Sequence, residues 1–476
     1  MSQKNKLIND PIHGYMSFEK WAIEVIDTPH FQRLRDIKQL GTTYYVFPSA
    51  SHNRFEHSLG TAHLAYTLTK RLQEQSGVEK SDHDLECVTL AALCHDLGHG
   101  PYSHVFDSIV IPYLKPSSKW KHEKGSEMMV EHLFEKLESY SIDLSSDDVK
   151  YIQALIKGDS TGISPYLFDI VSNERNSVDV DKFDYLARDC YQLGMKSLFD
   201  FSRLMQFSRV MDDQIVYYHK ECFNIYEMFH TRYSLHKKVY SHRVSGAIDY
   251  MIRDALVEAN SSLKIADAIE NAEEYIQLSD SILNKIEYSN LEGLTKSKEI
   301  IKQLRRRKLY KFVDECLIPK DKKDDMMKAI NEREIISYRN GNVSLHEDDV
   351  IVDWKTLNYA KKDENPVDAV KFYNDGDSTF PVPRSKVSYL FPVQYEEYIV
   401  RIFARKPDKV ISIDICCLIV SSRVTIDQST FVKKKNKKVE AIQGAFRELA
   451  KKLGLEPSQG FLKSGSRKRR FSEENP

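Results

Sequence analysis

Three histidines and two aspartates lie within residues 94–107, whose sequence is CHDLGHGPYSHVFD. The apolar run VTLAAL at residues 88–93 is typical of a buried helix, and the Gly98 and Gly100-Pro101 positions predict that this helix opens into a loop. Imidazole and carboxylate groups suit iron, manganese, zinc or magnesium, and the segment has no pair of cysteines for a structural zinc site. The sequence therefore predicts a divalent-metal centre with acid and base groups beside it.

The adjacent residues His95 and Asp96 supply only two ligands, so further ligands must come from other segments. Candidates are His57 in residues 53–60, NRFEHSLG, and Asp181 in residues 178–185, VDVDKFDY. Two imidazoles and two carboxylates leave coordination positions for water and a phosphate oxygen. An isolated His-Asp pair is more often a helix cap or a hydrogen-bonded core histidine, but the titratable residues that follow this pair favour a metal site.

Asp181, Tyr185 and Asp189 are spaced four residues apart, which places them on one face of a predicted helix, with Lys182 beside them. A carboxylate for the metal, an aromatic hydroxyl, a second carboxylate and a lysine suit a phosphorylated ligand that carries a sugar. The alternative is a solvent-exposed helix with surface ion pairs, which such charge patterns usually indicate.

The 476 residues suffice for two unequal domains and a large core without disulfides. With 69 basic and 70 acidic residues, the net charge of −1 neither favours nor excludes a nucleic-acid partner. Seven scattered cysteines fit the reduced thiols of a cytoplasmic or nuclear protein. The first residues lack a signal-peptide core and no apolar run reaches the about 18 residues of a membrane span, so we expect no membrane association.

Helical patterns dominate residues 15–310, and strand patterns with intervening prolines begin at about residue 335. Thr28-Pro29 predicts a helix start, residues 350–354 and 396–424 predict strands, and residues 443–453 predict a last helix. We therefore expect a mainly α protein. Its parts are an all-helical catalytic core over residues 1–335, a smaller C-terminal α+β lobe over residues 336–455, and a disordered basic tail over residues 456–476.

Several segments resemble the HD-domain dNTP triphosphohydrolases, and above all the SAM-and-HD-domain branch of that family. They are RFEHSLG at 54–60, CHDLGHGPYSH at 94–104 and DVDKFDYLARDC at 179–190, with shorter matches at 9–14, 26–29, 31–35, 37–41 and 228–232. The family hydrolyses a dNTP to the deoxynucleoside and inorganic triphosphate, so the resemblance implies an HD-domain phosphohydrolase core with that activity. The matches begin almost at the first residue, so we expect the SAM domain to be lacking.

The resemblance implies a metal site and a catalytic group. His57, His95, Asp96 and Asp181 match the metal ligands, and His99, His104, Asp107 and His122 match the acid, base and phosphate-contacting residues. Release of the 5′ oxygen needs an activated water and an acid, and an imidazole suits the acid. We expect His104 to be this acid, with Asp107 and His122 supporting it. From its neighbours Lys121 and Glu123 alone, His122 would be an exposed surface residue.

The resemblance also implies substrate contacts. Arg54, Lys182 and Arg232 match residues that hold the triphosphate, which guanidinium and ammonium groups bind well. The remaining matches, around the sugar, are Gln39, Leu40, Tyr185, Asp189, His236 and Tyr240. Leu40 and Tyr240 would exclude a ribose 2′ hydroxyl, although spacing alone favours core packing for both.

Nucleotides activate this family by joining subunits into a tetramer, so the resemblance implies a homo-oligomer with activator sites. Lys6, Asp27, Gln32 and Arg35 match the guanine-selecting site for GTP or dGTP. Asn9, Val46, Phe47, Arg203, Lys220, His242, Arg243 and Arg307 match the neighbouring dNTP site. The alternative is that the basic members are solvated surface residues. Two residues depart from the family: Ser241 replaces a glutamine beside the base, and Tyr218 replaces an arginine near the second activator.

Two other functions remain open. An HD hydrolase of another nucleotide phosphoester is favoured only by Ser241. A nucleotide-sensing protein that binds single-stranded nucleic acid is favoured by the basic segments 433–438 and 467–470. The second basic segment also matches a nuclear import signal, so we expect a nuclear or cytoplasmic location, or both.

Overall fold

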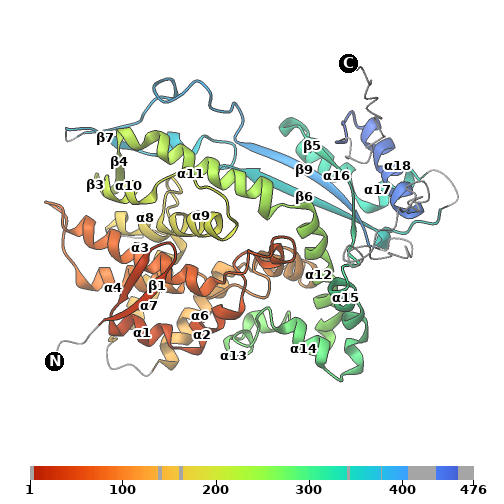
Figure 1. Ribbon diagram of the computed structural model, residues 1–476, viewed down its shortest axis with the longest axis horizontal. Coiled ribbons are helices and arrows are strands. Elements are labelled where there is room, and N and C mark those ends of the chain that lie inside the picture. Colours follow the sequence, from red (N-terminus) through yellow and green to blue (C-terminus); the bar gives the residue numbers. More distant parts are fainter. Residues whose placement is uncertain are drawn as a thin grey trace, which may run out of the picture. The chain divides into compact units, whose positions relative to one another are not determined.

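The computed structural model describes residues 5–137, 142–159, 164–339, 343–376, 378–405 and 436–458, and these residues are mainly helical, as predicted (Figure 1). The predicted strand region beyond residue 405, residues 433–435 of the first basic segment and the tail from residue 459 lie outside the described residues. Among the residues that are described, no helix combines the length and apolar character that crossing a bilayer requires.

The helices of the described residues are short to medium in length, and the strands form small sheets. The helices are α1 (Lys20–Ile26), α2 (Pro29–Gln32), α3 (Arg54–Gln73), α4 (Asp82–Cys94), α5 (Ile111–Leu114), α6 (His122–Lys136), α7 (Ser146–Lys157), α8 (Phe168–Val171), α9 (Val180–Gln192), α10 (Phe201–Gln206), α11 (Cys222–Leu235), α12 (Arg243–Leu263), α13 (Ala272–Tyr275), α14 (Ile282–Tyr288), α15 (Thr295–Arg305), α16 (Lys323–Ala329), α17 (Glu332–Ser337) and α18 (Lys437–Lys452). The strands are β1 (Lys6–Asp10), β2 (Gly14–Phe18), β3 (Ser208–Met211), β4 (Gln214–Tyr218), β5 (Lys311–Ile318), β6 (Val350–Asn358), β7 (Phe372–Tyr373), β8 (Thr379–Phe380) and β9 (Glu396–Ala404).

The described residues form two compact units. The first unit comprises those within Met1–Leu309 and Leu357–Glu396, and the second comprises those within Tyr310–Thr356 and Glu397–Pro476. This division differs from the boundary expected at residue 335, because β5 pairs antiparallel with β9 of the second unit. The segment after residue 357 returns to the first unit, where β7 pairs with β4 in parallel.

Helix caps determine where the predicted ligands lie in the first unit. Asn53 and Glu56 form a capping box at the start of α3, so His57 lies in its first turn. Asp179 caps α9 by accepting from the backbone N–H of Lys182 at 3.0 Å, which places Asp181 in the first turn of that helix. The predicted start at Thr28-Pro29 is confirmed in the same way, since Thr28 Oγ1 accepts from the N–H of Phe31.

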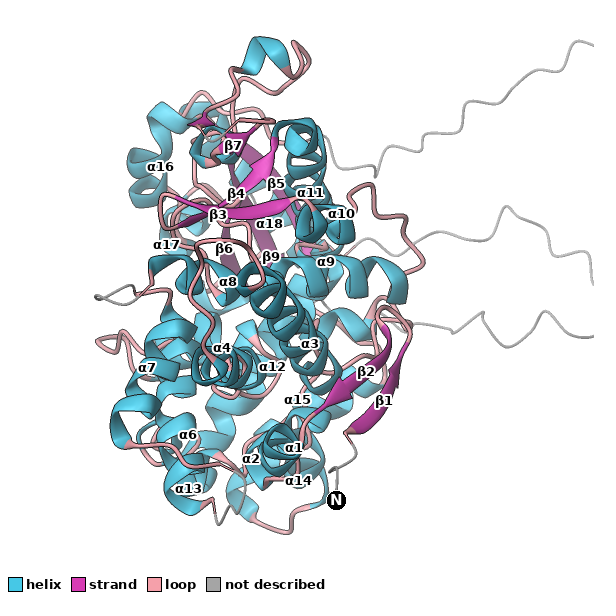
Figure 2. Ribbon diagram, turned by 90° about the vertical axis from the view of Figure 1, so that its left-hand side faces the viewer, coloured by secondary structure: helices cyan, strands magenta, loops and turns pink. Residues whose placement is uncertain are grey.

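Helix α3 lies in the core of the first unit and packs against α4 and α9 (Figure 2). Its apolar face is fully buried, with Leu59 and Ala62 at most 3% exposed. Gly60 permits the contact with α9, because a Cβ at this position would lie 1.9 Å from an oxygen of Asp184 and 2.5 Å from Nη2 of Arg188. A larger residue at Gly60 would therefore push α9 away from α3.

The second unit contains the three-stranded sheet β5-β9-β6 and α18. Val313, Cys316 and Val400 from the sheet and Phe446 from α18 are at most 2% exposed and share one apolar core. The predicted strand at residues 350–354 corresponds to β6, and the predicted last helix corresponds to α18, so the expected α+β character of this part of the chain is present.

Candidate active site

Four side chains from distant segments converge where α3 and α9 begin and α4 ends. His57 Nε2 lies 3.1 Å from Asp181 Oδ1 and 3.7 Å from Asp96 Oδ2. His95 Nε2 lies 3.3 Å from His57 Nε2, and 3.5 Å from an oxygen of each aspartate. Ligand atoms around one divalent ion are separated by about 3 Å, so these atoms can share an ion. The structure thus brings together the four predicted metal ligands, which we call the metal cluster.

Hydrogen bonds hold both imidazole rings with Nε2 toward the metal cluster. His57 Nδ1 donates to Asp184 Oδ2 at 2.7 Å, and His95 Nδ1 donates to the backbone oxygen of Ala92 at 2.8 Å. Donation by one ring nitrogen fixes the ring and leaves the other nitrogen for a metal.

The charges of the cluster favour a cation. Burial opposes a charge on His57, but hydrogen bonds to Asp181 and Asp184 and the charge of Asp96 outweigh it and raise the pKa of His57 to about 10. Burial would raise the pKa of Asp181, but hydrogen bonds to His57 and His95 hold that pKa well below its usual range. Both imidazoles therefore lie among ionised carboxylates, where a metal ion competes with protons for the nitrogen atoms.

Asp184 belongs to a buried network that the sequence analysis did not identify. It accepts hydrogen bonds from Nε and Nη2 of Arg188, both at 2.8 Å, and from Nε2 of His13 at 2.6 Å. Arg188 Nη1 donates to Asp10 at 2.8 Å, and the side chains of Asp184 and Arg188 are fully buried. The four-residue spacing of Asp184 and Arg188 was the available signal, but that spacing also occurs in surface ion pairs.

The predicted acid and base residues form a second group, which we call the acid–base group. The rings of His99 and His122 stack with centroids 3.9 Å apart, and the ring of His104 lies 5.0 Å and 5.2 Å from them. Asp107 Oδ2 accepts from His122 Nδ1 at 2.5 Å, and Asp107 Oδ1 lies 3.7 Å from His104 Nδ1. His99 Nε2 lies 3.3 Å from Asp96 Oδ1, so this group adjoins the metal cluster.

The exposure of His122 differs from what its neighbours in the sequence indicated. The His122 side chain is only 20% exposed because Asp107 holds it, whereas that of His104 is 67% exposed. Gly98 allows the loop to lie against the start of α6, since a Cβ there would lie 2.0 Å from the backbone oxygen of His122. Asp107 itself lies in a π-helical turn, Phe106–Val110, a local irregularity that is frequent at functional sites.

Two residues expected around the sugar lie in one hydrogen-bonded group. Asp189 accepts from the Tyr240 hydroxyl at 2.5 Å and from His52 Nε2 at 2.6 Å. Asp189 is 1% exposed, which excludes the solvent-exposed alternative for this end of α9. His52 was not predicted as a site residue, and the only signal for it in the sequence is its place in the SHNRFEHS segment at the start of α3.

The other expected sugar contacts lie in the same unit. The Tyr185 ring lies 6.3 Å from the ring of His57, and the His236 ring lies 4.9 Å from that of Tyr240. Burial, with the charges of Arg232 and His104, lowers the pKa of His236 to about 3, so its imidazole is neutral. Leu40 precedes the short 3₁₀ helix Gly41–Tyr45, and the buried Oε1 of Gln39 has no hydrogen-bond partner among the described residues.

Each basic residue expected at the triphosphate has a partner within the chain. Arg54 Nη1 lies 2.5 Å from Asp96 Oδ2, so it supports a predicted metal ligand. Lys182 Nζ donates to Asp179 at 2.9 Å, and Arg232 Nη1 donates to the backbone oxygen of Asn358 at 2.7 Å. Arg54 is also bound to Ser103, whose φ of 56° is left-handed and strained for a residue with a side chain.

The expected activator residues lie on several elements of the first unit. Lys6 and Asn9 lie on β1, Asp27 directly follows α1, and Arg35 Nε donates to Gln32 Oε1 at 2.8 Å.

The residues expected at the second activator include two close contacts. The rings of Phe47 and His242 lie 5.6 Å apart, and Arg307 Nη1 donates to the backbone oxygen of Tyr45, which precedes Val46, at 2.9 Å. Arg203 forms an ion pair with Glu221, and the Lys220 ammonium lies 5.6 Å from the ring of Tyr218, the residue that departs from the family. Arg243 begins α12.

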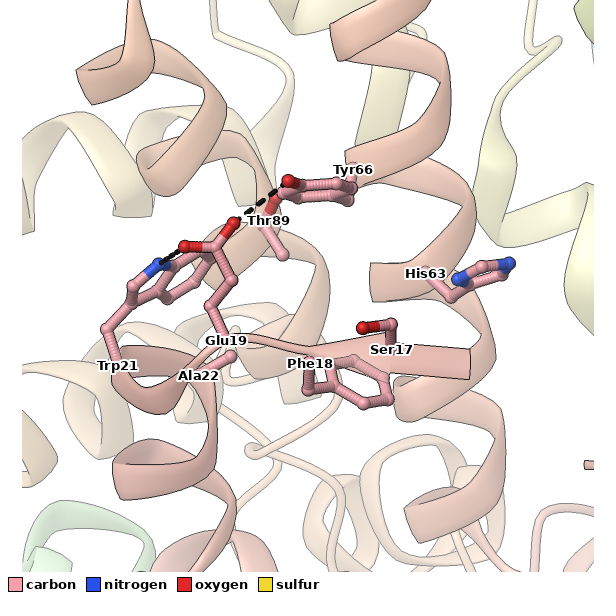
Figure 3. Close-up of a pocket in the computed structure, with 8 residues that line it drawn as sticks. All are labelled: Ser17, Phe18, Glu19, Trp21, Ala22, His63, Tyr66 and Thr89. Carbon is pink, nitrogen blue, oxygen red and sulfur yellow. Dashed lines mark hydrogen bonds between the residues drawn. The ribbon is translucent and has the colours of Figure 1, made fainter. Parts of the chain in front are cut away.

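A small cavity elsewhere in the first unit is lined by none of the predicted site residues (Figure 3). Glu19 lies between Trp21 and Tyr66 and accepts hydrogen bonds from Trp21 Nε1 at 3.1 Å and from the Tyr66 hydroxyl at 2.9 Å. These bonds connect residues from α1 and α3 with the end of β2.

Two family models match the part of the chain that contains the candidate site. The HD domain matches residues 54–189, which contain both the metal cluster and the acid–base group, and the HD associated region matches residues 199–371. The chain is 44% identical over 470 residues to the deoxynucleoside triphosphate triphosphohydrolase SAMHD1 homolog of Dictyostelium discoideum, a match that covers 98% of this chain and 84% of that protein. It is 40% identical over 447 residues to the deoxynucleoside triphosphate triphosphohydrolase SAMHD1 of Homo sapiens, covering 85% and 71%.

Proposed function

Because the chain belongs to the SAMHD1 family of HD-domain proteins, we propose that it is a metal-dependent enzyme that hydrolyses a dNTP to the deoxynucleoside and inorganic triphosphate. The observation that carries this proposal is the convergence of His57, His95, Asp96 and Asp181 on positions that one divalent ion can share. The names of its relatives supply the substrate class, since both describe deoxynucleoside triphosphate triphosphohydrolases.

The metal cluster suits iron, manganese, zinc or magnesium, since it combines two imidazoles with two carboxylates. When bound, such an ion lowers the pKa of water and offsets the charge of phosphate oxygens. The protein contributes ligand orientation: Asp184 holds the ring of His57, and Arg54 holds Asp96. Both contacts are buried, so they keep the ligands in place before a substrate arrives.

The acid–base group supplies the proton that the leaving 5′ oxygen needs. Cleavage of the bond between the α-phosphorus and that oxygen leaves negative charge on the oxygen, and we assign its protonation to His104. Hydrogen bonds to His104 and His122 outweigh the effect of burial and hold the pKa of Asp107 well below its usual range. Asp107 is thus an ionised carboxylate beside the imidazoles of His104 and His122.

The remaining predicted site residues would bind the sugar and the triphosphate of the substrate. Asp189, held by His52 and Tyr240, offers a buried acceptor for the 3′ hydroxyl. We propose that Leu40 and Tyr240 exclude a 2′ hydroxyl, and that Gln39, Tyr185 and His236 complete the sugar site. Lys182 and Arg232 would bind triphosphate oxygens after exchanging their present partners, Asp179 and Asn358.

Regulation by nucleotides is part of the proposal. GTP or dGTP at the first activator site and a dNTP at the second would join copies of the chain into a tetramer, so assembly would depend on nucleotide concentration. Support comes from the neighbouring aromatic rings of Phe47 and His242 and from the exposed guanidinium of Arg203. We further propose that the protein acts in the nucleus, the cytoplasm or both.

A product assay tests the activity directly. The purified chain is incubated with manganese, GTP and each dNTP, and products are separated by ion-exchange chromatography. We expect deoxynucleoside and inorganic triphosphate in equal amounts, and little product from the matching ribonucleotide. Monophosphate with pyrophosphate would indicate a different phosphoester reaction, and absence of product would contradict the proposal. Sizing the chain with and without GTP and dNTP tests assembly separately, because full activity at constant size would contradict only the regulation.

A further inference from the structure

A second group of metal-binding side chains lies between α4 and α7, at the opposite end of α4 from the metal cluster. His83 and Cys87 are four residues apart on α4, and Asp148 lies in the first turn of α7. His83 Nε2 lies 2.9 Å from Asp148 Oδ1 and 3.8 Å from Cys87 Sγ. All three ligand atoms lie within 4.8 Å of one another.

These separations are close to those around a tetrahedral zinc ion. With zinc–sulfur bonds of about 2.3 Å and zinc–nitrogen and zinc–oxygen bonds of about 2.0–2.2 Å, ligand atoms lie roughly 3.4–3.6 Å apart. The observed distances bracket these values, and a shift of a few tenths of an ångström at the half-exposed His83 side chain would match them. Cysteine, histidine and aspartate are all ligands that zinc accepts.

The surroundings hold two of the ligands in position. Ser145 donates from its backbone N–H at 2.8 Å and from its hydroxyl at 2.7 Å to Oδ2 of Asp148, which leaves Oδ1 toward His83. Cys87 is fully buried at the packed surface between α4 and α7. Besides burial, the charges of Asp148 and Glu86 raise the pKa of the Cys87 thiol to about 12, and the same charges attract a cation that replaces its proton.

We propose that His83, Cys87 and Asp148 bind a zinc ion, with water as the fourth ligand. The thiol proton of Cys87 passes to solvent when the sulfur binds, and no electron is transferred. The ion would join α7 to α4, the helix that ends directly before His95 and Asp96. This structural site is independent of the proposed activity, because none of its ligands belongs to the metal cluster.

Cobalt substitution distinguishes this site from the metal cluster. The full-length chain is stripped of metal and titrated with Co²⁺, because a thiolate ligand produces a near-ultraviolet charge-transfer band that imidazole and carboxylate ligands do not. We expect this band in the unaltered chain, and we expect zinc to remove it by displacing cobalt. The band should be absent from Cys87→Ser and from His83→Ala. The His83 side chain is 54% exposed, so its removal leaves the core intact.

Cys94→Ser is the matched control, because Cys94 is the buried cysteine next to His95 and should leave the band unchanged. Circular dichroism of each variant reports whether it is folded. Absence of the band from the folded, unaltered chain would overturn the proposal and leave His83 and Asp148 as an ordinary ion pair. Persistence of the band in either His83→Ala or Cys87→Ser would overturn it as well.

Discussion

Two pairs of neighbouring histidines in the first unit differ mainly in the charges around them. His57 Nε2 and His95 Nε2 lie 3.3 Å apart, and His30 Nε2 and His132 Nδ1 lie 2.8 Å apart. The first pair lies among the carboxylates of the metal cluster. The second has the mostly exposed Glu273 at its edge, 3.9 Å from His132 Nε2. Proximity of imidazoles alone therefore does not distinguish a metal site from core packing.

The pKa values of His57 and His30 are shifted in opposite directions, and the surrounding charges are the reason. Burial and, to a smaller extent, the charges of His132 and Arg33 lower the pKa of His30 to about 4. Burial acts in the same direction on His57, but nearby carboxylates reverse the result and raise its pKa to about 10. The stacked pair of His99 and His122 has a carboxylate at each ring, because His99 lies 3.3 Å from Asp96 and His122 is bound to Asp107. Burial and the charges of Arg54 and His122 nevertheless hold the pKa of His99 well below its ordinary value. For His57 and His30, the number of carboxylates close to the ring decides the direction of the pKa shift.

Removing a carboxylate beside His57 and His95 should make the surroundings of this pair resemble those of His30 and His132. For Asp181→Ala we expect loss of bound metal and a fall in kcat/KM of about 1,000-fold, which corresponds to several kcal/mol of transition-state stabilisation. Turnover and elemental analysis of the purified variant measure the two effects. Asp147→Ala removes a carboxylate of α7 that is 87% exposed and should leave both unchanged. Full activity of Asp181→Ala would contradict a role for the metal cluster.

Changing the acid–base group should affect proton transfer without loss of metal. Asp107→Asn removes the charge that supports His104 and His122, and we expect kcat to fall about 100-fold. Because Asp107 and His122 act through one hydrogen bond, the double variant Asp107→Asn, His122→Ala should be little worse than either single variant. Steady-state kinetics with metal analysis measures this. Additive losses would show that the two residues act separately.

Weakening the hydrogen bond between Asp184 and His57 should reduce metal binding less than removing Asp181 does. Asp184→Asn keeps an acceptor for His57 but removes a charge, so we expect about tenfold weaker metal binding in a chelator competition. Thermal unfolding is measured in parallel because Arg188 loses its ionic partner. Asp189→Asn is the matched control on the same helix, and it should raise KM for the dNTP without changing metal affinity. The reverse pattern would exchange the roles assigned to Asp184 and Asp189.

The sequence was sufficient to predict four residues that the fold brings close together, because His57, His95, Asp96 and Asp181 lie in short segments rich in histidine and aspartate. Their role as metal ligands stays a prediction. The sequence could not predict the buried hydrogen bonds that hold the site residues in place. Asp184 and His13 are 171 residues apart, and His52 and Asp189 are 137 residues apart, so each pairing depends on how α3, α9 and the β1-β2 hairpin pack. No local pattern encodes such a contact.

For the fold as well, the sequence predicted local elements but not the long-range contacts between them. Helix α18 and strand β6 follow from local hydrophobic patterns, and both were predicted. The return of residues 357–396 to the first unit depends on the parallel pairing of Tyr217 with Phe372, which lie far apart in the chain. Each of these strands is short, so its pattern alone does not identify the partner.

The smallest expected effect concerns the second histidine pair and the pH dependence of stability. The pKa of His30 is about 4 in the folded chain and 6.5 as its ordinary value, so between these values the unfolded chain binds more protons. The neutral His30 therefore stabilises the fold fully above about pH 6.5, and this contribution is lost as the pH falls toward 4. His30→Gln should reduce the slope of unfolding free energy against pH in this window by up to about 1.4 kcal/mol per pH unit, which equals one proton. Urea unfolding from pH 4.5 to 7.5 measures the slope. An unchanged slope in His30→Gln would mean that the pKa of His30 is not lowered in the folded chain.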